Sequence, residues 1–176
     1  MNPAACIRRL ARVTDTEIAG LTDVLLDCVE GGASVSFMQP LPRERAAGFW
    51  RKVARGVEAG ERVLLVAEDA EGICGTVQLI LDLPENQPHR ADLAKMLVHR
   101  RARHRGLGAA LMRAAEQAAL DCRRTLLVLD TVTDSSGYRL YERLGWKRVG
   151  EIPNFALWPQ GGHCPTTFFY RDLGTR

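Results

Sequence analysis

The stretch 103–108, which reads Arg-His-Arg-Gly-Leu-Gly, constrains this chain more than any other, because it joins two elements of different type. It follows a β-rich run over 93–99 and opens an apolar run with helical spacing over 107–120, which predicts a strand, a glycine turn and a helix. Glycines at such a junction let the backbone approach a ligand, and the first helical turn presents free N–H groups at the positive end of the helix dipole. The sequence therefore predicts an anion site, most often one for a phosphate or diphosphate.

A dinucleotide-binding fingerprint is the competing interpretation of this turn. Asp130 ends a predicted strand about 20 residues later, where that fingerprint has an acidic residue. Against it, Leu111 occupies the position of the third glycine, and the turn lies past the middle of the chain, with too little sequence after it for a nucleotide-binding domain. The simplest alternative is an ordinary helix start with a solvated basic flank.

Composition limits the partners. The 176 residues suit one domain, 1–176, with a sizeable core, and an apolar content of 46% favours a globular chain. The net charge is only +3, and basic residues gather at 100–105 instead of covering a broad face. A local cluster at a glycine turn fits a small phosphorylated ligand better than nucleic acid, which we do not expect as a partner.

The cysteines and the apolar runs limit the class of protein further. Five cysteines are widely spaced, and no pair has the spacing of metal ligands, so we expect reduced thiols, no metal and a cytoplasmic location. No segment approaches the ~20 apolar residues that cross a bilayer, and residues 1–13 carry no cleavage signal. We therefore expect no membrane partner.

Apolar spacing and turn residues predict the other elements in order. Before the glycine turn we expect strands over 7–13, 63–68 and 73–82 and helices over 18–29 and 41–57. Residues 14–17 carry helix-start chemistry for the first helix, with Thr or Asp able to cap it and Glu17 favourable in its first turn. The loop 31–38 between the two helices either walls a substrate pocket or is a turn with Phe37 plugged into the core. The sequence favours neither reading.

After the glycine helix, the apolar run 125–129 predicts a strand that is buried on both faces, with Asp130 and Thr131 at its carboxyl end. Ligands of a strand–helix–strand unit lie at the carboxyl ends of its strands, so Asp130 should lie near the mouth of the glycine turn. The remaining elements are expected as a short helix over 138–144 and closing strands over 146–151 and 167–171, with a loop over 153–165.

A second motif follows that strand, where residues 138–146 read Tyr-Arg-Leu-Tyr-Glu-Arg-Leu-Gly-Trp. This motif and the Arg-x-x-Gly-x-Gly of 103–108 resemble the two signatures of the GNAT family of N-acetyltransferases. The two motifs span roughly the last half of the chain, and the order of the earlier elements also fits that family. The resemblance implies an α/β fold, α+β by some schemes, of the acyl-CoA N-acyltransferase type, with a mixed, mainly antiparallel central sheet flanked by helices.

The resemblance also implies transfer of an acetyl group from acetyl-CoA, as cosubstrate, to an amine of a small molecule. Tyr141 matches the family tyrosine that protonates the leaving thiolate, although a tyrosine here could also merely pack. Asp130 and Asp92 are the candidate general bases, and either could instead bind the ammonium form of the acceptor or play a structural part. These three residues are the expected catalytic residues.

Other site residues are carried over from the same resemblance or are weaker candidates. Backbone N–H groups of 96–98 would face the acetyl carbonyl, where preset donors suit a developing oxyanion. The expected acetyl-CoA contacts are Met96, Leu97, Val98, Arg103, His104, Arg105, Gly106, Leu107, Gly108, Ala109 and Ser136. The candidates for the substrate pocket are Ser34, Phe37, Trp158 and His163.

A narrower resemblance, to acetyltransferases of the tabtoxin-resistance type, runs through 31–38, 129–131 and 163–166 and along nearly the whole chain. It implies an antibiotic or toxin acceptor such as a tabtoxin-like β-lactam. The chain departs from that type because Asp92 stands where it has glutamate and Cys164 interrupts a His–Pro pair. Peptide or protein acetylation, a non-catalytic CoA-binding regulatory module and a homodimer formed through sheet edges remain open.

Overall fold

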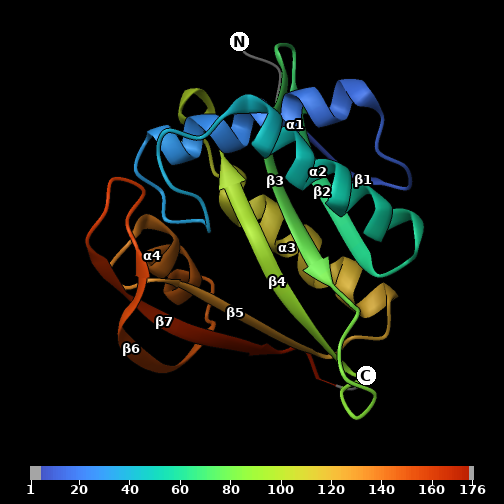
Figure 1. Cartoon of the computed structure of the whole chain (residues 1–176). Helices are drawn as coiled ribbons and strands as arrows, with labels where there is room; N and C mark the ends of the chain where they lie inside the picture. The colour runs from blue at the N-terminus through green and yellow to red at the C-terminus, as the bar shows by residue number, and fades with distance from the viewer. Residues whose placement is uncertain (1–4, 175–176) are drawn as a thin grey trace.

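The computed structural model describes residues 5–174 and builds them around a seven-stranded sheet with strand order β1-β2-β3-β4-β5-β7-β6 (Figure 1). All neighbouring strands are antiparallel except β4 and β5, so the expected mixed, mainly antiparallel sheet is confirmed. The strands are β1 (Cys6–Leu10), β2 (Arg62–Asp69), β3 (Gly72–Ile80), β4 (Arg90–Val98), β5 (Leu126–Val132), β6 (Lys147–Leu157) and β7 (His163–Asp172). The helices described are α1 (Asp15–Glu30), α2 (Arg43–Glu58), α3 (Leu107–Asp121) and α4 (Ser136–Arg143), with a 3-10 turn, η1, at Arg100–Ala102.

Helices cover both faces of the first half of the sheet. Leu64 and Val66 of β2 belong to an apolar cluster with α1 and α2, whereas Val63 and Leu65 belong to a cluster with α3 on the opposite face. Side chains alternate along a strand, so the continuous apolar run of β2 is buried from both sides. Figure 1 shows this arrangement, with α3 behind the strands that α1 and α2 cover.

Local sequence signals fix where α1 and α2 begin. Thr14 caps α1, because its Oγ1 accepts a hydrogen bond from the Glu17 N–H at 3.3 Å while Glu17 Oε2 accepts one from the Thr14 N–H at 2.7 Å. This reciprocal pair is a capping box. Pro42 stands at the N-cap of α2 in extended backbone, so that helix begins two residues later than the sequence predicts.

The pairing of β4 with β5 stops early and leaves a gap in the sheet. Only Arg90–Asp92 of β4 pairs with β5, and the two strands diverge beyond that point (Figure 1). Further along β4, two residues, Lys95 and Met96, lie opposite the single residue Val77 of β3. This arrangement is a β-bulge, and Lys95 within it has a φ of 52°. A bulge bends its strand and changes where the side chains point.

Two predictions for β5 are wrong. The sequence predicts that the run 125–129 is buried on both faces, but in that run only residues on the face that α3 covers are buried. The α1–α2 cluster includes residues of β2 and β4 but none of β5, so Val128 on that face is half-buried. That strand continues to Val132, so Asp130 lies within it and not at its end.

The loop expected over 153–165 is mostly strand, because β6 and β7 form a longer hairpin than the sequence indicates. Pro153 stays within β6 at an irregularity of the ladder between Ile152 and Ala156. A proline is tolerated there because β6 is an edge strand, whose outer N–H groups need no partner.

Candidate active site

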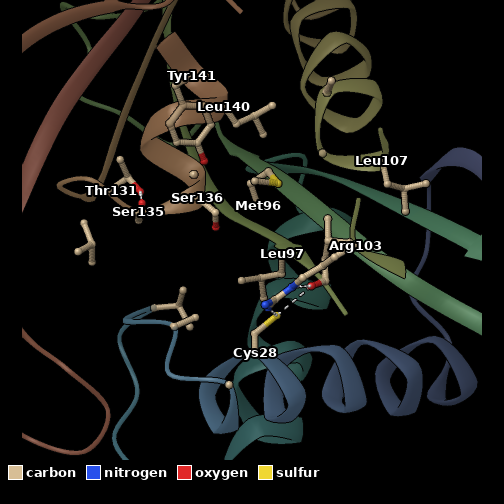
Figure 2. Close-up of a pocket in the computed structure, with 18 of the residues that line it drawn as sticks. Cys28, Met96, Leu97, Arg103, Leu107, Thr131, Ser135, Ser136, Leu140 and Tyr141 are labelled. Atoms are coloured by element: carbon tan, nitrogen blue, oxygen red, sulfur yellow. Dashed lines mark hydrogen bonds between the residues drawn. The ribbon is translucent and has the colours of Figure 1, made fainter. Parts of the chain in front are cut away.

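A cavity of about 780 Å³ borders the gap between β4 and β5 (Figure 2). Met96, Leu97 and Val98 line it from β4, and Thr131 and Val132 line it from β5. Among residues 5–174, β4 has no strand partner on this side beyond Asp92, so its backbone borders the cavity. The same cavity is bounded by the first turn of α3, by α4 and by residues 31–35.

The N-terminus of α3 forms one wall. Gly106 stands at the N-cap with a φ of 76°, a left-handed conformation that glycine adopts without steric cost. The first helical hydrogen bond runs from the Ala110 N–H to the Gly106 carbonyl at 3.1 Å, so the N–H groups of 107–109 have no acceptor in a preceding turn. Residues 107–109 all line the cavity, so the free N–H groups of this helix start border it. Anion binding by these groups stays a prediction.

Gly108 is needed for a different reason, which is close packing. A Cβ on this residue would lie 3.0 Å from Leu140 Cδ2 of α4 and 3.9 Å from Met96 Sδ of β4. The two signature motifs of the sequence therefore meet at this glycine, with α4 resting against the first turn of α3.

The arginines near the glycine turn have different tasks. The sequence predicts that Arg100 and Arg101 add charge for the ligand, but they pair with acids of the protein, Arg100 with Asp27 and Arg101 with Asp69. Those acids are distant in the sequence, so the basic cluster of 100–105 serves partly to fix the turn. Arg105 is exposed and does not line the cavity.

Arg103 lines the cavity but is also held by the protein (Figure 2). Its Nε donates to the Val98 carbonyl at 3.0 Å, and its Nη2 lies 3.9 Å from Cys28 Sγ. His104 lines the cavity as well. Burial raises the pKa of the Cys28 thiol above its ordinary value, with Arg103 opposing that shift, so the thiol stays protonated at neutral pH.

Two further arginines, which sequence reasoning missed, line the cavity. Arg113 lies on α3 seven residues after Gly106, a spacing of two helical turns that returns it to the same side. Arg143 lies within the second motif on α4. That helical spacing was the available signal for Arg113.

Tyr141 projects from α4 toward the cavity. The helix begins at Ser135, whose Oγ accepts a hydrogen bond from the Tyr138 N–H at 3.1 Å. The Tyr141 ring packs 6.0 Å from the rings of Trp146 and Phe169, and only 5% of the residue is exposed. Figure 2 shows its hydroxyl oxygen directed toward the space between Ser136 and Met96.

The chemistry of that hydroxyl follows from its surroundings. No hydrogen bond to it is found among the described residues, and burial, with the charge of Asp130 adding to it, raises the pKa of Tyr141 well above the usual 10. Tyr141 is therefore a neutral phenol with a proton to donate. Ser136, the other α4 residue expected to contact the cosubstrate, also lines the cavity.

Neither candidate carboxylate lines the cavity directly. Asp130 is exposed and precedes Thr131, which lines the cavity. Partial loss of water around its carboxylate raises the pKa of Asp130 above the usual value, although Lys95 opposes that shift and Asp92 adds to it. Asp92 is half-buried and forms an ion pair with Arg90. Asp130 is thus the acid without a close basic partner, and Asp92 is the one already paired.

The loop 31–38 both lines the cavity and packs into the core, the two alternatives that the sequence left open. Residues 31–35, with Ser34 among them, line the cavity together with Trp158 of the β6–β7 hairpin. Phe37 instead packs edge-to-face on Phe49 at 5.4 Å in the α1–α2 cluster. His163 is exposed at the start of β7 and does not line this cavity.

Two negative findings apply to residues 5–174. No helix there combines the length and the apolar run that crossing a bilayer requires. No three His, Cys, Asp or Glu side chains in that range gather as ligands for a metal ion. The five cysteines of the chain are free thiols.

Comparison with known proteins identifies the class. The split sheet, the glycine-started α3 and Tyr141 meet in one cavity, which is the arrangement that the two sequence motifs imply for an acetyltransferase. Residues 60–148, half of the chain, match the family model described as an acetyltransferase (GNAT) domain. The chain belongs to the GNAT acetyltransferase family.

Solved structures share the whole fold. A ribosomal-protein-alanine N-acetyltransferase from Brucella melitensis superposes with a TM-score of 0.79 at 19% identity, covering 96% of this chain and 99% of that one. An N-acetyltransferase from Staphylococcus aureus Mu50 gives 0.79 at 15% identity, covering 97% and 99%. The yncA protein from Salmonella typhimurium, solved with its cofactor acetyl-CoA, gives 0.79 at 16% identity, covering 98% and 95%.

Proposed function

We propose that this chain transfers the acetyl group of acetyl-CoA to a primary amine of a small molecule. The observation that carries the proposal is the single cavity that joins the free N–H groups of 107–109 to the Tyr141 hydroxyl along the unpaired edge of β4. A helix start with free N–H groups and a buried proton donor that line one cavity suit a phosphorylated donor with a reactive end.

The residues present fit acetyl-CoA. The diphosphate would lie at the N-terminus of α3, with Arg113 and Arg143 adding positive charge, because a helix start binds anions through its free N–H groups. Acetyl-CoA supplies an acyl group activated as a thioester. The backbone of 96–98 would supply hydrogen bonds where negative charge develops on the acyl oxygen.

The proton steps fall to two side chains. An amine must lose a proton to become a nucleophile, and Asp130, whose pKa is raised, is a stronger base than an ordinary aspartate. Tyr141, whose pKa is also raised, keeps its proton at neutral pH and can give it to the leaving thiolate. Asp92 is the weaker candidate because Arg90 already neutralises it.

A bounded pocket supports a small acceptor over a peptide. Ser34 Oγ donates to the Leu157 carbonyl at 2.7 Å, and the Gln39 N–H donates to the Pro159 carbonyl at 2.9 Å. These bonds tie the loop after α1 to the β6–β7 hairpin, so two segments that line or flank the cavity close it from one side. An antibiotic or toxin such as a tabtoxin-like β-lactam stays a prediction from the narrower resemblance.

The test is thiol release from acetyl-CoA across a panel of small primary amines and short peptides, with the acetylated product identified by mass spectrometry. We expect thiol release that depends on a small amine and yields the N-acetyl product. Acetylation of peptides alone would replace the small-molecule proposal. Tight acetyl-CoA binding without turnover of any compound would favour a regulatory module.

A further inference from the structure

Lys95 has an unusual backbone conformation at the gap between β4 and β5. It sits in the β4 bulge with a φ of 52°, a backbone conformation that side chains other than glycine rarely adopt. Met96, the next residue, lines the cavity. The Lys95 side chain lies on the face of the sheet that α2 covers, where its Nζ is 5.7 Å from the centre of the Phe49 ring. Conformations of this kind persist where the surroundings fix them, often at functional sites.

The contacts of the Lys95 ammonium group are neutral. Nζ donates to Ser36 Oγ at 3.1 Å, and Ser36 directly follows the loop residues 31–35 that line the cavity. Among the described residues, no carboxylate oxygen lies within the 4.0 Å of an ion pair with Nζ. An ammonium group has three N–H donors, so two of them remain for a ligand.

Asp130 lies on the same face of the sheet, across the gap from Lys95. Ala91 and Leu93 point into the α3 cluster, so Asp92 between them points to the opposite face, and it pairs with Val128 of β5. Asp130, two residues after Val128, shares that face. Burial lowers the pKa of Lys95, and the charge of Asp130 partly offsets this effect.

The gap between β4 and β5 is therefore bordered on one face by a cation from β4 and an anion from β5. Building on the proposed function, we propose that Lys95 binds a carboxylate of the acceptor while Asp130 faces its amine, so that the acceptor is a small amino acid. A carboxylate would accept charge-assisted hydrogen bonds from the N–H donors that Ser36 leaves free.

The test uses matched pairs of compounds, each α-amino acid beside the amine that remains when its carboxylate is removed. Thiol release from acetyl-CoA and calorimetric binding to the CoA-loaded protein are measured for both members of each pair. The variants are Lys95→Met, which keeps the length of the side chain without its charge, and Lys95→Arg, which keeps the charge. Lys52→Met, on the exposed face of α2, is the control for loss of one positive charge.

For at least one pair we expect the wild type to prefer the amino acid by about tenfold or more in kcat/KM, through a lower KM. Lys95→Met removes this preference by raising the KM for the amino acid and hardly affects the amine, Lys95→Arg restores part of it, and Lys52→Met changes nothing. Binding of amino acids that requires Lys95, without any turnover, would keep Lys95 as the group that binds the carboxylate, but it would overturn the proposed function and with it the claim that the amino acid is the acceptor.

Turnover of amines that is equal with and without a carboxylate would overturn the inference and leave the proposed function standing. A preference for the amino acid that Lys95→Met retains would also overturn it, because another group would then bind the carboxylate. If no pair shows either binding or turnover, both the inference and the proposed function are overturned.

Discussion

Asp27 of α1 accepts two hydrogen bonds from Arg100, one from its backbone N–H at 2.7 Å and one from its Nε at 2.8 Å. Only 10% of the Asp27 side chain is exposed, and His99 Nδ1 lies 3.6 Å from the same carboxylate. This carboxylate therefore joins the end of α1 to the turn that leads from β4 into α3. It holds the backbone that leads to the proposed anion site, although it does not line the cavity.

Asp27→Asn should weaken acetyl-CoA binding about three- to tenfold, because the turn before Gly106 loses its anchor, and should cost about 1–2 kcal/mol of unfolding free energy. Calorimetry and urea unfolding measure the two effects. Glu30→Gln is the control, since Glu30 binds the same arginine with a side chain that is 75% exposed, and an exposed pair is worth about 0–1 kcal/mol. An unchanged affinity in Asp27→Asn would limit Asp27 to folding.

The contribution of Asp27 to stability should depend on pH. Burial acts to raise its pKa, but the hydrogen bonds from Arg100 and the nearby His99 outweigh burial and lower the pKa below the usual 3.8. A depressed pKa means that the stabilisation is complete above about pH 4 and is lost as the pH falls through the folded-state value. The difference in unfolding free energy between wild type and Asp27→Asn should therefore shrink below about pH 4, and a difference that grows there would contradict the account.

Tyr141→Phe should lower kcat about 100-fold, the usual worth of a general acid, and should change acetyl-CoA affinity less than about twofold. Because the pKa of Tyr141 is raised, ionisation of this residue should not reduce kcat below about pH 10. Tyr138→Phe is the matched control on the same helix, since its ring packs on Phe169 at 5.2 Å and does not line the cavity. Steady-state kinetics decide, and equal losses in the two variants would remove Tyr141 as the acid.

Asp130→Asn and Asp92→Asn should separate the two candidate bases. We expect Asp130→Asn to lower kcat/KM for the amine about 100-fold and Asp92→Asn to have a smaller effect, because Arg90 already pairs with Asp92. The raised pKa of Asp130 should set an acid limb of the pH profile above the usual 3.8, and Asp130→Asn should abolish that limb. A larger loss in Asp92→Asn would reverse the assignment.

Sequence reasoning succeeded where the signal is local. The capping pair Thr14 and Glu17 is three residues apart, and the glycine turn at Gly106 lies directly between the two elements that it joins. In each case the residues that determine the structure are close together in the chain. The prediction needed only backbone preferences and the geometry of a helix start.

Sequence reasoning failed where the partner is distant in the chain. Arg100 pairs with Asp27, 73 residues away, so nothing near Arg100 distinguishes a residue that fixes the turn from one that binds a ligand. The β6–β7 hairpin was underestimated because Pro153 usually ends a strand, and only the position of β6 at the sheet edge allows it. The bulge that turns Lys95 toward α2 likewise depends on how β4 pairs with β3.

Gly106→Val provides a direct probe of the anion site. Gly106 has a φ of 76°, and a Cβ on this residue would meet no atom within 4 Å, so valine would strain the backbone without a clash. Gly60→Val is the matched control, because Gly60 has a φ of 72° and equally open space at the end of α2. Both variants should lose about 1–2 kcal/mol of unfolding free energy, but only Gly106→Val should bind acetyl-CoA about tenfold more weakly.

The most direct test of the account compares calorimetric titrations of the wild type with acetyl-CoA and with acetyl-pantetheine, which has the same thioester but lacks the diphosphate and the phosphorylated adenosine joined to it. If the start of α3 binds the diphosphate, acetyl-CoA should bind about 100-fold more tightly than acetyl-pantetheine, and Gly106→Val should reduce that ratio about tenfold. Equal affinity of the wild type for the two compounds would contradict the account.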